Sequence, residues 1–127
     1  FGDADATVDG IVEQLRGGNA AMLCGNKYAS PVLEKCIATL GSRFQRALVA
    51  NLFQCMHDEV LCALLNDNYA NYVVQALIDE CGPECLDVIA ARISSVQPLV
   101  QYGRKLLQRI QKRTQGGFKT GHKSDKW

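Results

Sequence analysis

Apolar residues recur three and four positions apart along most of the chain, which is the spacing of amphipathic helices. The clearest stripe lies in residues 69–81, where Val73, Val74, Leu77 and Ile78 share one arc of a helix. Further stripes cover residues 8–16, 30–40, 44–52, 60–65, 86–93 and 99–113, and a short helix of small residues is expected at 19–25. Breaks such as Gly82-Pro83 separate them. The pattern therefore predicts an all-α fold.

Local signals predict where these helices begin. Asn19 is expected to cap the short helix, and Ser30 to cap the helix over 30–40, where Pro31 would occupy the first turn. Ser42 to Gln45 has the pattern of a capping box for the helix that follows. Residues 1–7 are expected to be frayed, and the tail over 116–127, which has no periodicity, to be disordered.

The helix over residues 69–81 recurs along the chain. A shift of 41 positions superimposes four pairs of identical residues: Tyr28 on Tyr69, Ala29 on Ala70, Val32 on Val73 and Ile37 on Ile78. A forward shift of 33 superimposes Tyr102 on Tyr69 and Gln108 on Gln75. A period of this size with a constant frame indicates an array of helical repeats. We assign the frame, including Tyr28 and Tyr69, to the core, and the residues that lengthen the first interval to a loop over Gln54–Asp58.

The positions that vary within this frame are candidates for function. They form three triplets: Ser30/Pro31/Glu34, Asn71/Tyr72/Gln75 and Arg104/Lys105/Gln108. Asn71 and Gln75 lie four residues apart, so their amides are expected side by side on one helix face, next to the ring of Tyr72. An amide donates and accepts hydrogen bonds at once, and a ring offers a surface for stacking. This combination favours contact with a nucleobase.

The segments NYANYVVQ and KYASPVLEKCI resemble the second-helix motifs of Pumilio (PUF) RNA-binding repeats, and VQYGRKLLQRI resembles the half-repeat that closes such a domain. The resemblance covers roughly residues 8–114. It implies a right-handed α-solenoid of three-helix repeats, divided into the end of a preceding repeat (1–18), two repeats (19–55 and 56–95), a closing half-repeat (96–115) and a basic tail (116–127). The chain begins with Phe1, and we expect it to be a piece of a longer protein.

The resemblance also implies roles for the triplets. Asn71 and Gln75 resemble the pair that reads uracil, with Tyr72 stacking, and Ser30 and Glu34 resemble the pair that reads guanine. Such modules bind RNA antiparallel to the protein. The implied readout is therefore 5′-UG, the opening of a UGU element in mRNA 3′ untranslated regions, bound for post-transcriptional repression or decay. Protein co-regulators are further expected partners.

Two positions depart from the family pattern. Pro31 occupies the stacking position of the guanine triplet, where the family has a residue able to stack. Arg104, Lys105 and Gln108 belong to the closing half-repeat, which reads no base in the family. Arg104 and Lys105 are candidates for contact with the RNA backbone instead.

Two other functions remain open from the sequence. One is a helical-repeat scaffold for protein interactions, and the other is a PUF-like protein that binds ribosomal-precursor RNA without reading bases. An enzyme is not expected: no nucleophile motif is present, and His57 and His122 lie in a predicted loop and in the tail. The intact Asn71/Tyr72/Gln75 triplet favours base reading over both alternatives.

Charge is distributed unevenly along the 127 residues. The whole chain carries +1, but residues 101–127 hold eight basic residues against one acidic residue, and residues 1–100 carry −6. A basic end can follow a phosphate backbone or can be a solvated terminus. No apolar run is long enough to cross a membrane, and the first residues are not a signal peptide.

The six cysteines form no Cys-x-x-Cys pair, and Cys81 and Cys85 alone would share a helix face. We therefore expect no metal site and no cofactor, but buried, reduced thiols in a cytoplasmic protein, with Cys36 at a core position. The N-terminal face of the array is expected to mediate self-association, since repeats bury each other's apolar surfaces. The candidates are Val8, Ile11, Val12, Leu15, Met22 and Leu23.

Overall fold

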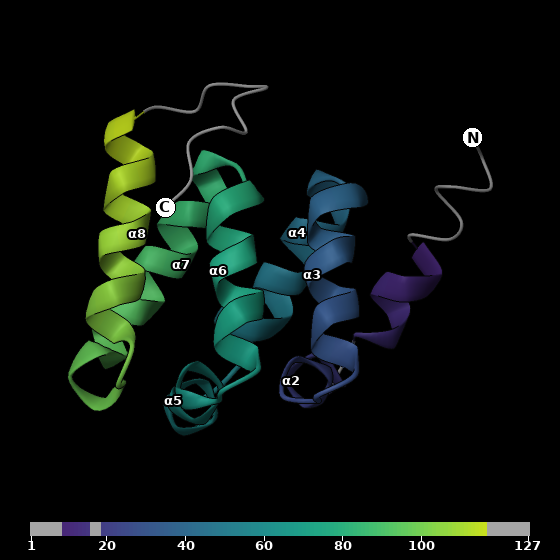
Figure 1. Cartoon of the computed structure of the whole chain (residues 1–127), viewed down its shortest axis with the longest axis horizontal. Coiled ribbons are helices and arrows are strands. Elements are labelled where there is room, and N and C mark those ends of the chain that lie inside the picture. The colour runs from purple at the N-terminus through teal and green to yellow at the C-terminus, as the bar shows by residue number, and fades with distance from the viewer. Residues whose placement is uncertain (1–8, 16–18, 117–127) are drawn as a thin grey trace.

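A computed structural model describes residues 9–15 and 19–116 of the chain (Figure 1). The segments expected to be frayed, over 1–7, and disordered, beyond Gly116, lie outside these residues. Within them the chain is helical and contains no strand. After a short helix over residues 9–14, the elements are α2 (Asn19–Cys24), α3 (Ala29–Thr39), α4 (Ser42–Val49), the π-helix η1 (Ala50–Gln54), α5 (Asp58–Asn66), α6 (Ala70–Glu80), α7 (Pro83–Val96), the 3₁₀ helix η2 (Gln97–Leu99) and α8 (Gly103–Gly116).

The helices are arranged in layers (Figure 1). Helices α3, α6 and α8 lie side by side as one row, with α6 in the middle packed on both neighbours. Helices α4 and α7 lie behind this row, and α2 and α5 are seen end-on along its lower edge. The order first helix, row helix, back helix occurs twice, in α2–α3–α4 and in α5–α6–α7. The all-α solenoid predicted from the sequence is confirmed.

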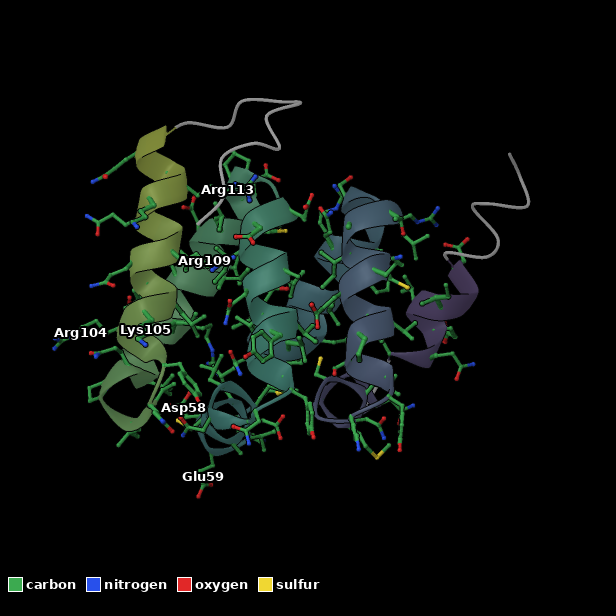
Figure 2. The ribbon with its side chains drawn as sticks, viewed as in Figure 1. Asp58, Glu59, Arg104, Lys105, Arg109 and Arg113 are labelled. Atoms are coloured by element: carbon green, nitrogen blue, oxygen red, sulfur yellow. The ribbon has the colours of Figure 1, made fainter. Side chains whose placement is uncertain are left out.

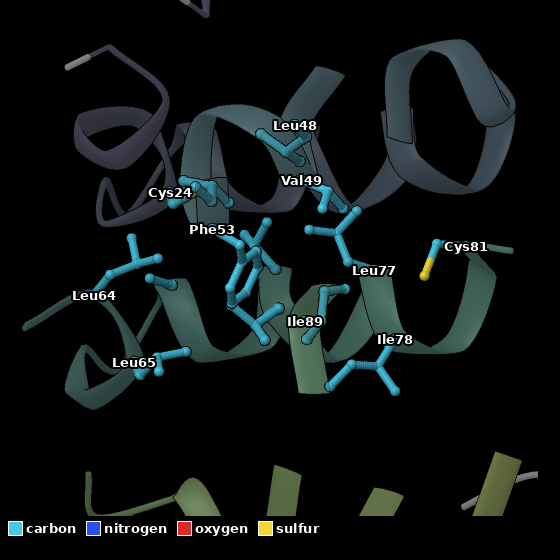
Figure 3. Packing of buried hydrophobic residues seen from close by; sticks show 14 of the residues in the cluster. Cys24, Leu48, Val49, Phe53, Leu64, Leu65, Leu77, Ile78, Cys81 and Ile89 are labelled. Atoms are coloured by element: carbon cyan, nitrogen blue, oxygen red, sulfur yellow. The ribbon is translucent and has the colours of Figure 1, made fainter. Parts of the chain in front are cut away.

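The core runs between the row and the helices behind it (Figure 3). The predicted buried arc of α6 is confirmed, since Val73, Val74, Leu77 and Ile78 are all fully buried. Their neighbours in the core include Leu48, Val49 and Phe53 from α4 and η1, and Ile89 from α7. Burial of a side chain of this size is worth about 1.5–3 kcal/mol. This core fixes the orientation of α6 and therefore the direction in which its polar face points.

The starts of α3 and α6 differ from the prediction. Ser30 is buried inside α3 and is not its cap. Instead, the Oδ1 atom of Asn26 accepts hydrogen bonds from the backbone N–H groups of Tyr28 (2.8 Å) and Ala29 (2.9 Å). Asp67 makes the same pair of bonds to Tyr69 and Ala70 before α6, at 2.8 and 2.9 Å. Short Asn and Asp side chains bond readily to the backbone two and three residues on, so they start both helices.

The capping predictions for the other helices are also wrong. Helix α4 has no side-chain cap: Ser42 is already its first residue, after Gly41 at φ +86°, a backbone conformation that glycine adopts easily. Gln45 does not reach back to the helix start but is buried, and its Nε2 donates to the carbonyl of Ile37 at 2.8 Å. Asn19 is the first residue of α2. The predicted loop over Gln54–Asp58 has helical residues at both ends: Gln54 is the last residue of η1, and Asp58 is the first residue of α5.

Part of the predicted core is exposed. Tyr28 is 76% and Tyr69 42% exposed, because both lie in the turns before α3 and α6, at the edge of the helix layers. Val32 is 60% exposed although its equivalent Val73 is fully buried. The stripe of α6 that contains Val73 is covered because α6 lies in the middle of the row, whereas α3 is the first row helix among the described residues. The repeat frame is therefore constant in sequence but not in environment.

The cysteine prediction holds for half of the thiols. All six cysteines are free, and Cys24, Cys81 and Cys85 are buried, but Cys36 and Cys62 are half-buried and Cys55 is exposed. Cys55 lies in the turn after η1, outside the helix layers. Burial raises the pKa of the Cys24 thiol to about 12, with a smaller contribution from the negative charge of Asp67. Burial also raises the pKa of Cys81 to about 12. These two thiols are protonated and unreactive at neutral pH.

Polar contacts hold the last helix in place. Arg109 of α8 pairs with Asp79 of α6 through two bonds of 2.8 and 2.6 Å, and Arg113 donates to the carbonyl of Ile78 at 2.6 Å. Figure 2 shows both arginines directed from α8 toward α6. Asn66 at the end of α5 accepts from the backbone N–H of Gln101 at 2.7 Å. These contacts fix α8 as the third member of the row.

Among the described residues, no single helix is long and apolar enough to span a membrane. Ser42–Gln54 and Asp58–Asn66, which are bent by 117° at their break, reach that length and apolar composition only together. The part of the chain that the structure describes contains no cluster of three or more His, Cys, Asp or Glu residues placed to hold a metal ion.

Candidate nucleic-acid interface

The three predicted triplets lie on the row formed by α3, α6 and α8. Each occupies the first two turns of its helix: Ser30, Pro31 and Glu34 on α3, Asn71, Tyr72 and Gln75 on α6, and Arg104, Lys105 and Gln108 on α8. Because these helices lie side by side, the triplets are at corresponding heights on neighbouring helices (Figure 1). We call this surface the triplet face.

The amide pair on α6 is formed as the sequence predicts. The Nε2 atom of Gln75 donates to Oδ1 of Asn71 at 2.7 Å, so the two side chains lie against each other. Asn71 is only 6% exposed, and its Nδ2 donates to the carbonyls of Asp67 (3.1 Å) and Asn68 (3.0 Å). Asn71 therefore has a structural role that the sequence did not reveal: it holds the turn before α6 and orients Gln75.

Gln75 retains hydrogen-bonding capacity at the triplet face. It is half-buried, and a glutamine amide has two N–H donors and a carbonyl acceptor. One N–H is given to Asn71, and the described residues supply no partner for the other N–H or for the carbonyl. A ligand that presents both an acceptor and a donor can therefore bind Gln75 without breaking the amide pair.

Tyr72 is available for stacking. It is 57% exposed and lies next to the amide pair, in the first turn of α6. A planar ring in this position can cover the face of a base whose edge is held by the amides. Pro31 occupies the equivalent position on α3 and is also exposed, but it offers a smaller surface that is not aromatic.

The pair on α3 differs in character from the amide pair. Ser30 is buried and Glu34 half-buried one turn later, and no hydrogen bond joins them within the described residues. Burial raises the pKa of the Glu34 carboxyl above its usual value. As a carboxylate the group offers two acceptor oxygens, and partial desolvation strengthens the bonds that a donor pair would make to it.

The α8 triplet is exposed and positively charged. Arg104, Lys105 and Gln108 all face solvent. Figure 2 shows Arg104 directed away from α6, whereas Lys105 lies on the side of α8 that faces the viewer. The comparison of triplets missed a further exposed basic residue on this helix, Lys112, which lies seven residues after Lys105 and so on nearly the same stripe. That helical spacing was the signal that could have found it.

Comparisons with known proteins agree with this architecture. The model of the Pumilio-family RNA-binding repeat matches residues 19–53 and 62–94. A Pumilio domain-containing protein of Schizosaccharomyces pombe is 30% identical over 94 residues, which are 72% of this chain and 13% of that protein. The crystal structure of PUF-8 in complex with PBE-RNA has the same fold, with a TM-score of 0.67 and 22% identity over 87% of this chain and 32% of that one. The chain therefore belongs to the Pumilio family.

Proposed function

We propose that the chain binds single-stranded RNA along the triplet face and reads the bases 5′-UG of a UGU-type element. The proposal extends to its setting: mRNA 3′ untranslated regions, post-transcriptional repression or decay, a cytoplasmic location and no enzymatic activity. Membership of the Pumilio family supports RNA as the ligand, because PUF repeats read one base per helical repeat with two or three side chains. The residues of the triplet face support the choice of bases.

The observation that carries the proposal is the bonded amide pair of Asn71 and Gln75 beside exposed Tyr72. Uracil presents a carbonyl acceptor next to its N3–H donor. The second N–H and the carbonyl of Gln75 complement these two groups, while Tyr72 covers the face of the base. Adenine and cytosine present the reverse order, an amino donor beside a ring-nitrogen acceptor. Because the bond to Asn71 fixes the orientation of the Gln75 amide, the pair favours uracil over these two bases.

Glu34 supports guanine at the neighbouring position. A carboxylate accepts from guanine N1–H and N2–H₂ together, a pair of donors that no other base presents on that edge. Glu34 is half-buried on the helix beside α6, at the height of Gln75. If the strand runs antiparallel to the protein, the base at α6 is 5′ of the base at α3, which gives 5′-UG.

A protein-interaction scaffold is the second candidate, and one observation favours it. A shallow groove of about 260 Å³ separates α2 from α5 and is lined mainly by apolar side chains, including Met22, Val60 and Leu64. Met22 is 67% and Val60 46% exposed. The groove reaches Asp67 and Ala70 at the start of α6, but no triplet residue lines it. It could therefore hold a protein co-regulator while RNA occupies the triplet face.

The test is to change the base preference of α6. The double variant Asn71→Ser/Gln75→Glu copies the α3 pair onto α6, and its carboxylate would repel uracil carbonyls and accept from guanine. Binding of fluorescent RNAs that differ only at the 5′ base should shift from U to G, with about 1–3 kcal/mol per mismatch, by analogy with other base contacts. Tyr72→Ala should weaken all four RNAs alike, since stacking tolerates every base.

The control is Gln108→Glu, which introduces the same charge at the equivalent position of α8, where no base is read. It should leave the preference at the U position unchanged. Retention of the U preference by the double variant, or a change of specificity in Tyr72→Ala, would show that α6 does not read the base. Binding is expected to be micromolar or weaker, because two base contacts leave little free energy after the cost of association.

A further inference from the structure

All charged residues of helix α8 are basic. Its five charged side chains are Arg104, Lys105, Arg109, Lys112 and Arg113, and neither α8 nor the preceding η2 contains Asp or Glu. Two of the five are engaged with α6: Arg109 through Asp79, and Arg113 through the carbonyl of Ile78. The other three, Arg104, Lys105 and Lys112, are exposed.

Helical geometry divides these three residues into two groups. Lys105, Arg109 and Lys112 are four and three residues apart, so they lie on one stripe, and Arg109 in the middle of it contacts α6. Lys105 and Lys112 therefore lie one turn before and one turn after Arg109, beside the edge of α8 that contacts α6. Arg104 is one residue before Lys105, about 100° around the helix, and Figure 2 shows it directed away from α6.

The repeat offset identifies what the two lysines replace. With Tyr102 aligned to Tyr69, Lys105 takes the position of Tyr72, and Lys112 takes the position of Asp79. At the position where α6 offers a ring for stacking, α8 offers an ammonium group, and where α6 carries a carboxylate, α8 carries a second ammonium. The first substitution removes a stacking surface, and both add a positive charge suited to a phosphate.

We propose that Lys105 and Lys112 form a phosphate-binding site that holds the RNA backbone immediately 5′ of the base at α6, without regard to sequence. The inference rests on the proposed function for the direction of the strand: a strand that places U on α6 and G on α3 continues in its 5′ direction over α8. The ligand is the phosphodiester backbone of one or two nucleotides. The site extends the footprint of the triplet face beyond the bases that it reads.

The experiment compares short RNAs containing UG with the same RNAs extended by three nucleotides at the 5′ end, in separate A, C and U versions. Fluorescence anisotropy with the complete chain should show tighter binding of all three extended RNAs to a similar degree. If two phosphates are bound, this gain in affinity should fall about 7-fold between 50 and 200 mM salt, because the slope of log affinity against log salt concentration is about −0.7 per phosphate on single strands. Methylphosphonates, which are neutral, at the two 5′ linkages should abolish the gain.

The variant Lys105→Gln/Lys112→Gln should lose the gain from the 5′ extension while keeping the preference for U. The matched control Arg104→Gln removes a positive charge from the other side of the same helix and should keep the gain. All three side chains are exposed, so circular dichroism should report unchanged folding. A 3′ extension should respond equally in wild type and the lysine variant.

Several results would overturn this proposal. They are the absence of any gain from the 5′ extension, a gain that survives in the lysine variant or with methylphosphonates, or an equal loss in Arg104→Gln. The proposed base reading fails separately, if U is not preferred at the α6 position. In that case a charge-dependent 5′ gain would still support the phosphate site, as binding of backbone without base choice.

Discussion

Replacing Asn71 by Ala should show that the amide pair has two separable roles. The substitution removes three hydrogen bonds: those that Nδ2 donates to the carbonyls of Asp67 and Asn68, and the one that Oδ1 accepts from Gln75. Gln75→Ala removes only the last of these. The two variants therefore affect the same amide pair but differ in what they do to the turn before α6.

The expected magnitudes follow from burial. Each hydrogen bond contributes about 0.5–1.5 kcal/mol net, and Asn71 is nearly inaccessible to water. The better helix propensity of Ala offsets up to about 0.7 kcal/mol of the loss, and the exposed Asn68 lets its carbonyl regain water. Asn71→Ala should therefore lower the free energy of unfolding by about 1–3 kcal/mol. Gln75→Ala, with one bond lost at a half-buried site, should lower it by about 0.5 kcal/mol.

Urea denaturation followed by far-ultraviolet circular dichroism measures both values, and RNA binding is measured in parallel. We expect both variants to lose the preference for U, but Asn71→Ala alone to lose substantial stability. Gln108→Ala, at the equivalent exposed position of α8, is the control and should change neither property. Equal stability losses in the two variants, or a fully stable Asn71→Ala, would refute the assignment of Asn71 as a structural support for the turn.

Three further predictions address other parts of the chain. A double-mutant cycle on Asp79 and Arg109 should give a coupling energy of about 1–2 kcal/mol, above that of most exposed pairs because the contact is bidentate and three-quarters buried; a value near zero would contradict it. Because the pKa of Glu34 is raised, this carboxyl takes up its proton at a higher pH than an exposed glutamate does, and the preference for G over A should weaken from that higher pH downward. Fluorescence anisotropy across a pH series tests this, and a preference that persists in acid argues against the contact. We also expect self-association through exposed Met22 and Val32, reduced by Ser at either position; light scattering that finds only monomer at high concentration would refute it.

The fold could be predicted from the sequence wherever a helix has neighbours on several sides. For α6, the apolar stripe and the actual burial coincide: Val73, Val74, Leu77 and Ile78 are all fully buried, and α6 has neighbours on both sides. For α3 the same stripe is only partly covered, and Val32 is exposed. A repeat pattern specifies which side of each helix is apolar. It does not specify whether a neighbour is present to cover that side.

The helix starts were predicted poorly for a different reason. Ser30 and Ser42 are good capping residues, but capping depends on the backbone angles of the residue, which neighbouring turns decide. Asn26 bonds the backbone of Tyr28 and Ala29, so α3 begins at Ala29, before the Ser30 that was expected to cap it. At the candidate site, the sequence predicted that Asn71 and Gln75 meet, because a four-residue spacing is local. It did not reveal that Asn71 also bonds the turn before its own helix.

The N-terminal region is where sequence and structure differ most. Among the residues expected to mediate self-association, Leu15 is buried in the core, and Ile11 and Val12 are half-buried against it. Val8 lies outside the described residues. Met22 is exposed as expected. The short helix over residues 9–14 therefore uses its apolar side to cover the array. The surface left for association is formed by Met22 and by the uncovered stripe of α3.

The position of α6 in the middle of the row has a consequence for the order in which the chain opens. In a solenoid each unit is stabilised by its neighbours, so units at the ends open before those in the middle. Helix α8 is fastened to α6 by arginine contacts, whereas the outer stripe of α3 is partly uncovered. Local unfolding should therefore begin at α2 and α3 and reach α6 last. Amide hydrogen exchange would then be slowest in the helix that carries Asn71 and Gln75, so that this amide pair persists while the helix that carries Ser30 and Glu34 opens.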